Sequence, residues 1–267
     1  MSSFAEKYGP WALVTGASAG IGREMAIQIA ERGLNVVLVA RRAEVLEQLA
    51  KEIKSGCNVE TRIIPCDLSR EDYLAVIDEG SKDLQIGLLI NNAGAPSYHG
   101  WFLDRKLADI DSSIHFNINV QVHLIHHFGN KMIEHGRGGI VQVSSITGHI
   151  SMPFMAEYSA NKGYQINFGE ALSYELKEKG IDVLVLSPGA TKTDRLAVGM
   201  EVAPVARAGL DSLGKQPLKI PGLKNQWSAF KKRHLLTRKA SVRVSGNFQR
   251  RSLDPNKSWG GGKIQGK

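Results

Sequence analysis

Residues 11–22 read Trp11-Ala12-Leu13-Val14-Thr15-Gly16-Ala17-Ser18-Ala19-Gly20-Ile21-Gly22. The first five are apolar or β-branched and predict a buried strand, and the amphipathic pattern that begins at Gly22 predicts a helix directly after it. Glycines at such a junction let the backbone approach a ligand closely, and the helix N-terminus presents unpaired N–H groups to a phosphate. A plain tight turn is the alternative. The stretch therefore predicts a dinucleotide pyrophosphate site formed by Gly16, Ser18, Ala19, Gly20, Ile21 and Gly22.

Short apolar runs and amphipathic stretches alternate along the rest of the chain. Strands are predicted at 11–15, 35–40, 59–64, 87–91, 139–144 and 182–187, with a short seventh at 218–220. Helices are predicted at 22–32, 43–55, 69–82, 113–135, 157–179 and 205–213. Continuous apolar runs such as 36–39 suit parallel strands that are covered on both faces. We therefore expect an α/β fold, a Rossmann-type doubly wound parallel sheet in a single domain over residues 1–221.

Length and composition agree with one intracellular domain. The chain has 267 residues, of which 42% are hydrophobic, so it can bury a substantial core. No apolar run approaches the roughly 20 residues of a membrane-spanning helix, and Met1–Tyr8 lacks the apolar segment of a secretion signal. We therefore expect a cytoplasmic protein, in which Cys57 and Cys66 stay reduced and have no chemical role.

The positive charge of the chain is concentrated after the break at Pro221-Gly222. Residues 222–267 contain 12 Lys or Arg residues and one acid, Asp254, whereas residues 1–221 carry a net charge of −3. Leu223, Trp227 and Phe230 would share one face of an amphipathic helix, and a flexible tail is predicted from Thr237 onward. A solvated extension and weak contact with an anionic membrane surface are the alternatives; nucleic acid is not an expected partner.

The end of the second strand indicates which dinucleotide binds. A carboxylate at this position would bind the ribose 2′-hydroxyl of NAD, but the chain has Arg41 and Arg42, which suit a 2′-phosphate. A solvated arginine pair is the alternative. Asp67 and Leu68 follow the third strand, where Asp67 would contact the adenine edge or cap a helix. The predicted cofactor is therefore NADP (NADPH).

Two further groups of residues predict the chemistry. Tyr158 and Lys162 are four residues apart, so they share one face of a helix, and a fixed cation there would lower the tyrosine pKa from its usual value of about 10. Ser144 and Ser145 follow a strand at the carboxyl edge of the sheet, and Ser145 is the better candidate to bind a substrate oxygen. General acid–base catalysis by Tyr158 follows from this arrangement.

A third segment, Asn91-Asn92-Ala93-Gly94, ends another strand on the same edge of the sheet. We expect Asn91, Ala93 and Gly94 to brace the sheet and to pass near the cofactor.

This set of motifs resembles that of the short-chain dehydrogenase/reductases over residues 9–220. The matching segments, in the same order, are Thr15–Gly22, Asn91–Gly94, Ser145, the pair Tyr158 and Lys162, and Pro188 to Thr193. The step of thirteen residues from Ser145 to Tyr158 agrees as well. The opening at 7–12 and the arginine pair are similar to the NADP-preferring branch of bacterial ketoacyl and hydroxysteroid reductases.

The resemblance implies roles for individual residues. Tyr158 is the catalytic acid/base, Lys162 lowers its pKa and binds the nicotinamide ribose, and Ser145 positions the carbonyl. An asparagine binds a proton-relay water; Asn117 and Asn119 compete, and position along the helix favours Asn117. The loop that closes over the nicotinamide would use Pro188, Gly189, Thr191 and Thr193. A homodimer or homotetramer is implied as well.

The expected function is therefore NADPH-dependent interconversion of a carbonyl and an alcohol on an apolar small molecule. A non-catalytic NADPH-binding sensor or scaffold is the main alternative, and a sugar-nucleotide epimerase is opposed by the chain length and by the glycine spacing. His123, His126 and His127 are spaced like metal ligands, but no carboxylate or cysteine accompanies them in the sequence, so a partner-facing helix surface is predicted instead of a metal site.

Overall fold

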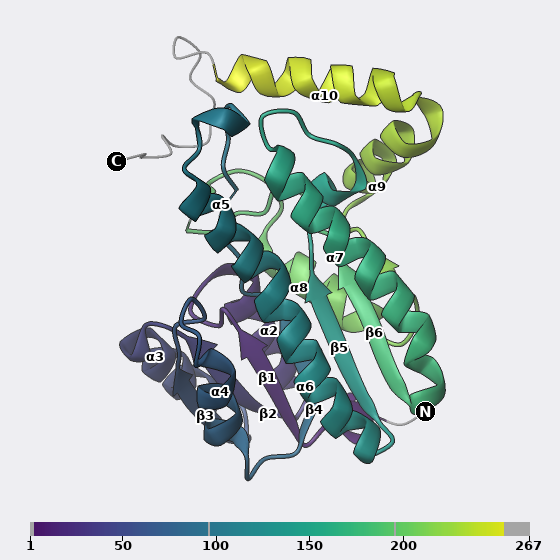
Figure 1. Cartoon of the computed structure of the whole chain (residues 1–267). Helices are drawn as coiled ribbons and strands as arrows, with labels where there is room; N and C mark the ends of the chain where they lie inside the picture. Colours follow the sequence, from purple (N-terminus) through teal and green to yellow (C-terminus); the bar gives the residue numbers. More distant parts are fainter. Residues whose placement is uncertain (1–2, 96, 195, 254–267) are drawn as a thin grey trace.

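A seven-stranded parallel sheet forms the centre of the molecule (Figure 1). The computed structural model describes residues 3–95, 97–194 and 196–253. The strand order is β3-β2-β1-β4-β5-β6-β7. The strands β2 and β3 lie on one side of β1, and the strands from β4 onward lie on its other side, so the order of the strands switches between β1 and β4. The strands are β1 (Trp11–Thr15), β2 (Asn35–Ala40), β3 (Thr61–Pro65), β4 (Ile86–Asn91), β5 (Gly138–Val143), β6 (Ile181–Leu186) and β7 (Leu218–Lys219). The predicted Rossmann-type doubly wound sheet is confirmed, and ligands of such sheets bind at the carboxyl ends of the strands.

Helices cover both faces of this sheet. One face packs against α2 (Gly20–Glu31), α3 (Ala43–Gly56) and α8 (Val202–Ser212). The other packs against α4 (Tyr73–Ser81), α6 (Val120–Glu134) and α7 (Ala156–Glu175), while α1 (Phe4–Tyr8) precedes β1. Along β2, Val36 and Leu38 belong to one core cluster, and Val37 and Val39 belong to the other. Burial on both faces explains why these strands are continuously apolar.

The helix predicted at 113–135 begins earlier and is interrupted. It consists of α5 (Leu107–Ile114), one π-helical turn η2 (His115–Asn119) and then α6. Such a turn changes the direction in which side chains leave the helix, and it often marks a functional site. Short 3₁₀ helices are found at η1 (Phe102–Asp104), η3 (Ile146–His149) and η4 (Lys177–Lys179).

The prediction of a flexible tail from Thr237 is wrong over residues 238–252. After α9 (Leu223–Phe230) and the π-helical η5 (Lys231–Leu235), the chain forms α10 (Arg238–Ser252), which crosses above the start of α7 (Figure 1). Thr237 caps α10 by accepting the N–H of Ala240. Its buried face is made of Ser241, Ser245 and Gln249, so the usual apolar pattern is missing from the sequence. Small residues allow close packing: a Cβ on Gly246 would lie 3.1 Å from Pro153. Residues 254–267 lie outside the described part.

Within that part of the chain, none of the helices combines the length and the apolar character that crossing a bilayer requires.

Candidate active site

The glycine-rich turn leaves the N-terminus of α2 open to an anion. The N-cap residue Ala19 provides no side-chain cap, and the first turn contains no acid. Gly16 and Gly20 adopt positive φ values of 68° and 55°, and a Cβ on Gly22 would lie 2.5 Å from the carbonyl oxygen of Gly16. Glycine is therefore required at this turn. Uncapped N–H groups and a close backbone approach fit the pyrophosphate of a dinucleotide.

Thr15 fastens the end of β4 to this turn. Its hydroxyl accepts the N–H groups of Asn92 and Ala93 at 3.0 and 3.1 Å and donates to the carbonyl of Ile90 at 3.2 Å. Asn91 points the other way: it is fully buried, and its amide donates to the Gln121 carbonyl at 2.9 Å. Asn91 thus braces the sheet, whereas Ala93 and Gly94 line its carboxyl edge.

The arginine pair lies at the carboxyl end of β2, beside the glycine-rich turn. Arg42 donates to the Ser18 hydroxyl at 3.4 Å, and both arginines are exposed. The N–H of Ser69 and, more weakly, Arg41 lower the pKa of Asp67, which also accepts the Ser69 hydroxyl at 2.8 Å. The carbonyl of Leu68 is bonded to His115 at 3.0 Å. Two cationic side chains, Arg41 and Arg42, therefore lie at the carboxyl end of β2, where the sequence analysis expects a 2′-phosphate.

Tyr158 lines a cavity of about 220 Å³ between the segment before α5 and the start of α7. The other walls include Trp101, Phe102, Arg105, Phe154 and Met155. Ser145 follows β5, and its hydroxyl lies beside the phenol, where it lowers the pKa of Tyr158. Ser144 is buried instead, and its hydroxyl donates to the main-chain carbonyl of Lys162 at 2.8 Å. The geometry thus supports the choice of Ser145.

The predicted lowering of the Tyr158 pKa by Lys162 is not found in the protein without a ligand. Burial raises the pKa of Tyr158, the Ser145 hydrogen bond lowers it, and the charge of Glu157 raises it. Burial also lowers the pKa of Lys162 to about 7. The lysine nitrogen lies 5.7 Å from the centre of the tyrosine ring, and it donates to the Val143 carbonyl at 3.2 Å and to Gln165 at 3.0 Å. Desolvation therefore outweighs the attraction that the four-residue spacing suggested.

The π-helical turn η2 contains both candidate asparagines and places their side chains in different surroundings. Asn119 is exposed, whereas Asn117 is fully buried and donates to the Ser113 carbonyl at 2.9 Å. Its Oδ1 has no hydrogen-bond partner in the described part of the chain. A Cβ on Gly94 would lie 2.9 Å from this oxygen and 3.8 Å from Nζ of Lys162. This unpaired acceptor lies beside Gly94, as the lysine nitrogen does, and its position supports Asn117 as the relay residue.

The loop after β6 reaches the glycine-rich turn. The Pro188 carbonyl accepts the N–H of Ile146 at 2.9 Å, and the Thr191 hydroxyl donates to the Gly189 carbonyl at 3.1 Å. The methyl group of Thr193 lies 3.0 Å from the position of a Cβ on Gly20. The loop therefore borders the region where the nicotinamide end of a dinucleotide would lie.

The three histidines of α6 do not converge. His123 is bonded to the Tyr73 hydroxyl at 2.6 Å, and His127 to Asp78 at 2.9 Å. No group of three or more His, Cys, Asp or Glu residues in the described ranges is arranged to bind a metal ion.

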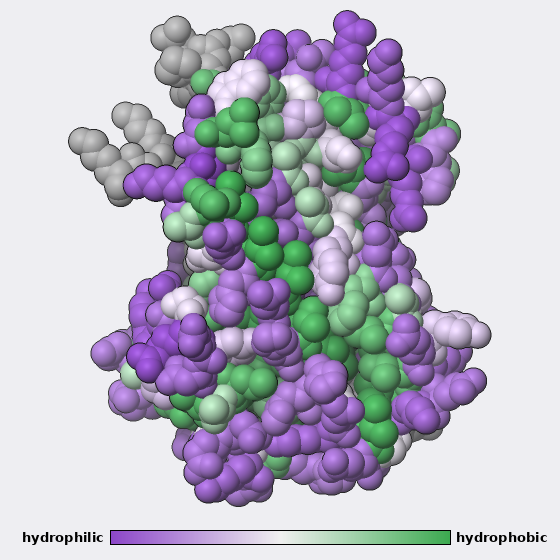
Figure 2. Space-filling model, viewed as in Figure 1, coloured by the Kyte–Doolittle hydropathy of each residue, from purple (hydrophilic) through white to green (hydrophobic). Residues whose placement is uncertain are grey.

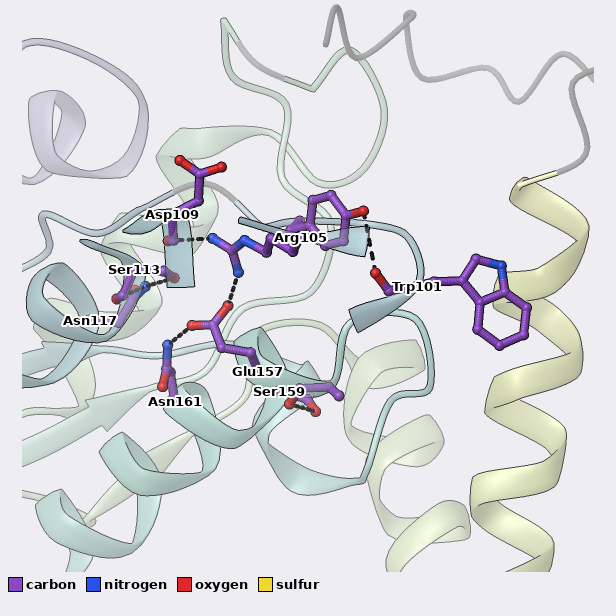
Figure 3. Close-up of polar contacts among 10 residues, drawn as sticks. Trp101, Arg105, Asp109, Ser113, Asn117, Glu157, Ser159 and Asn161 are labelled. Carbon is purple, nitrogen blue, oxygen red and sulfur yellow. Dashed lines mark hydrogen bonds and ion pairs between the residues drawn. The ribbon is translucent and has the colours of Figure 1, made fainter. Parts of the chain in front are cut away.

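Two sets of site residues escaped the sequence analysis. Arg105 and Glu157 form an ion pair at the cavity wall, with Asn161 bonded to the same carboxylate (Figure 3). The buried amide of Gln165 accepts from the Lys162 nitrogen, and it belongs to a hydrogen-bonded group of amides with Gln121 and Gln142. A polar residue three positions beyond the lysine, on the same helix face, is the clue that could have revealed Gln165.

Comparisons with known proteins define the family. The model of the short chain dehydrogenases matches residues 10–200. The chain is 36% identical to the 7beta-hydroxysteroid dehydrogenase of Clostridium sardiniense over 225 residues, which cover 80% of this chain and 86% of that one. It is 41% identical to the inactive hydroxysteroid dehydrogenase-like protein 1 of Pongo abelii over 72% of this chain and 59% of that relative.

Solved structures agree. A 7beta-hydroxysteroid dehydrogenase superposes with a TM-score of 0.86 at 28% identity, covering 91% of this chain and 99% of that one. A short-chain dehydrogenase from Sphingobium yanoikuyae in complex with NADPH gives 0.75 at 28% identity, with coverages of 96% and 99%. By its matched residues and its fold, this chain belongs to the short-chain dehydrogenase family.

Proposed function

We propose that the chain is an NADP(H)-dependent oxidoreductase that interconverts a carbonyl and a secondary alcohol on an apolar small molecule. The observation that carries the proposal is the position of Tyr158 at the wall of a cavity, with the Ser145 hydroxyl beside its phenol and the Lys162 nitrogen 5.7 Å from the centre of its ring. The family supports carbonyl/alcohol redox chemistry as the reaction class.

The hydroxyl groups of Ser145 and Tyr158 can bind one carbonyl oxygen together. Tyr158 then donates its proton to that oxygen, and general acid catalysis of this kind contributes about 10²- to 10⁴-fold to a rate. In its protonated form Lys162 offers a positive charge beside the phenolate that remains, and Asn117 Oδ1 offers an acceptor near the lysine nitrogen. A nicotinamide dinucleotide bound along this edge would supply or accept the hydride.

Two observations support NADP over NAD. The end of β2 carries Arg41 and Arg42 at the position where a carboxylate would select a 2′-hydroxyl. The related Sphingobium protein was solved with NADPH. The cofactor residues proposed are those of the turn, the arginine pair, Asp67, Leu68, Asn91 to Gly94 and the loop from Pro188 to Thr193.

An apolar substrate suits the cavity wall. Trp101, Phe102, Phe154 and Met155 contribute apolar surface, and the charge of Arg105 is matched by Glu157. A wall of this kind binds hydrocarbon better than charged groups.

Tyr158→Phe tests the mechanism. Ketones, steroids and acyl thioesters are screened with the wild type by NADPH absorbance, with NADH as a control, and turnover is then compared with that of the variant. We expect the variant to bind NADPH with unchanged affinity and to lose turnover. Near-normal turnover of Tyr158→Phe would disprove this mechanism.

The existence of a relative described as inactive keeps a non-catalytic NADPH-binding role as the second candidate. A wild type that binds NADPH tightly but converts no compound of the screen supports this role. Turnover that depends on Tyr158 excludes it.

We further propose a cytoplasmic homodimer or homotetramer. Apolar side chains gather in a band over α6 and α7 (Figure 2), where Ile133, Tyr164 and Tyr174 are exposed. Light scattering after size exclusion gives the mass of the assembly, and a monomer at micromolar concentration contradicts the proposal.

A further inference from the structure

A buried carboxamide connects Lys162 to Asn117. Gln165 is 2% exposed and follows Lys162 by three positions on α7. Its Oε1 accepts from the lysine nitrogen at 3.0 Å, and its Nε2 donates to the main-chain carbonyl of Asn117 at 2.6 Å and to Gln121 at 2.7 Å. One side chain therefore contacts two of the four residues proposed for catalysis.

Further amides fix the orientation of Gln165. Oε1 of Gln121 accepts from both Gln165 and Gln142, while its Nε2 donates to the Ala93 carbonyl at 2.7 Å. Oε1 of Gln142 in turn accepts from Asn91 at 3.2 Å. An ammonium can only donate and a carbonyl can only accept, so the amide groups between Lys162 and Ala93 have one consistent orientation. The buried amides link α7, α6, β5 and β4 through these bonds.

We propose that Gln165 is a positioning residue that fixes the nitrogen of Lys162 beside Tyr158. This inference rests on the proposed function. A lysine side chain has four rotatable methylene groups, and among the described residues its nitrogen has two acceptors, the Val143 carbonyl and Gln165. The protonated nitrogen has three N–H donors, and two of them are used in these bonds. One donor is therefore left for the phenol or for a ligand. Without Gln165 the nitrogen would retain one anchor and the Asn117 carbonyl would lose its donor.

The groups that face the lysine nitrogen make its charge sensitive to residue 165. From β5 and η2 these are the Val143 carbonyl and the Asn117 carboxamide, which are uncharged, and Tyr158 is the titratable group on its own helix. Burial lowers the pKa of Lys162 to about 7, so the folded chain releases this proton before the unfolded chain does. The contribution of Lys162 to stability should therefore rise with pH above pH 7.

Gln165→Met and Gln165→Glu form the test, because they act oppositely on Lys162. Methionine keeps the length but removes the acceptor, which lowers the lysine pKa; glutamate adds a charge, which raises it. We expect Gln165→Met to reduce kcat about tenfold or more with a nearly unchanged NADPH affinity. The pH midpoints of kcat should move in opposite directions for the two variants.

Gln28→Met is the matched control. Gln28 is a buried glutamine of α2 that donates to the Ala203 carbonyl at 3.0 Å and lies apart from Lys162 in the fold. It should lose denaturant resistance as Gln165→Met does, with unchanged kcat and pH midpoint. A wild-type kcat and pH midpoint in Gln165→Met, or equal changes in both methionine variants, overturn the proposal.

A second measurement needs no substrate. Denaturant titrations between pH 7 and about pH 8.5, below the range in which the buried thiol of Cys66 titrates, should show the rise in stability in the wild type, a flatter profile in Lys162→Met and a much reduced rise in Gln165→Glu. A Gln165→Glu profile equal to that of the wild type overturns the inference. If instead Tyr158→Phe stays active while these profiles behave as expected, the proposed function fails and the effect of Gln165 on Lys162 stands.

Discussion

Arg105 and Glu157 form an almost fully buried ion pair, with side chains 9% and 8% exposed (Figure 3). Glu157 directly precedes Tyr158 in the sequence. Arg105 also donates to the Asp109 carbonyl at 2.8 Å and lies over the ring of Tyr98. The pair therefore fastens the segment before α5 to the start of α7, across the cavity wall.

Breaking this pair on one side should destabilise the fold strongly. Arg105→Met or Glu157→Leu leaves one buried charge without its partner, and we expect each to lower the free energy of unfolding by about 3–5 kcal/mol. The double variant should cost less than the sum. Denaturant titration of the four proteins measures the coupling, and strictly additive losses would show that the two groups do not interact. The exposed pair Arg62 and Asp83 is the control, for which Asp83→Asn should change little.

The same carboxylate should influence the pH dependence of catalysis. The charge of Glu157 raises the pKa of Tyr158, so Glu157→Gln should lower it. Alcohol oxidation requires the deprotonated phenol, hence its rate rises as pH passes the tyrosine pKa, and that rise should move to lower pH in the variant. Profiles of kcat against pH test this, with Glu175→Gln at the exposed far end of α7 as the control. An unmoved profile contradicts the prediction.

The arginine pair should decide between the two dinucleotides. Arg41→Ser and Arg42→Ser remove cations from the end of β2, and the loss of a charge-assisted contact should weaken NADPH binding about ten- to a hundredfold. NADH binding should change little because NADH lacks the 2′-phosphate. Fluorescence titrations measure both affinities, with Lys51→Ser on the exposed face of α3 as the control. Equal losses for both dinucleotides would refute the assignment.

The basic extension predicts weak contact with anionic membranes. Residues 222–253 contain nine Lys or Arg residues and no acid. Leu223, Trp227 and Phe230 are 82%, 60% and 48% exposed on one face of α9. We expect salt-sensitive retention on anionic vesicles and none on neutral ones, since each basic residue near such a surface contributes about 1 kcal/mol.

Sedimentation with vesicles tests this contact. Replacing the three apolar residues of α9 by serine should reduce retention, whereas Tyr174→Ser, which alters an 85% exposed residue of α7, should not. Equal retention on both lipids, or none on either, dismisses the contact and leaves a solvated surface.

Local sequence patterns determined the sheet and the order of the site motifs. The strand, the glycine turn and the helix at 11–32 are consecutive in the chain, so their spacing and turn chemistry specify their geometry directly. The same holds for Tyr158 and Lys162, which lie within one helix.

Tertiary structure alone decided between neighbouring candidates. Ser144 differs from Ser145, and Asn119 from Asn117, only in the direction of the side chain, which the end of β5 and the π-helical turn fix. It also decided the pKa of Lys162 and the helical conformation of α10, because burial, the Val143 carbonyl and Pro153 are supplied by segments that are distant in the sequence. Desolvation depends on everything that surrounds a group, and no local pattern records those neighbours.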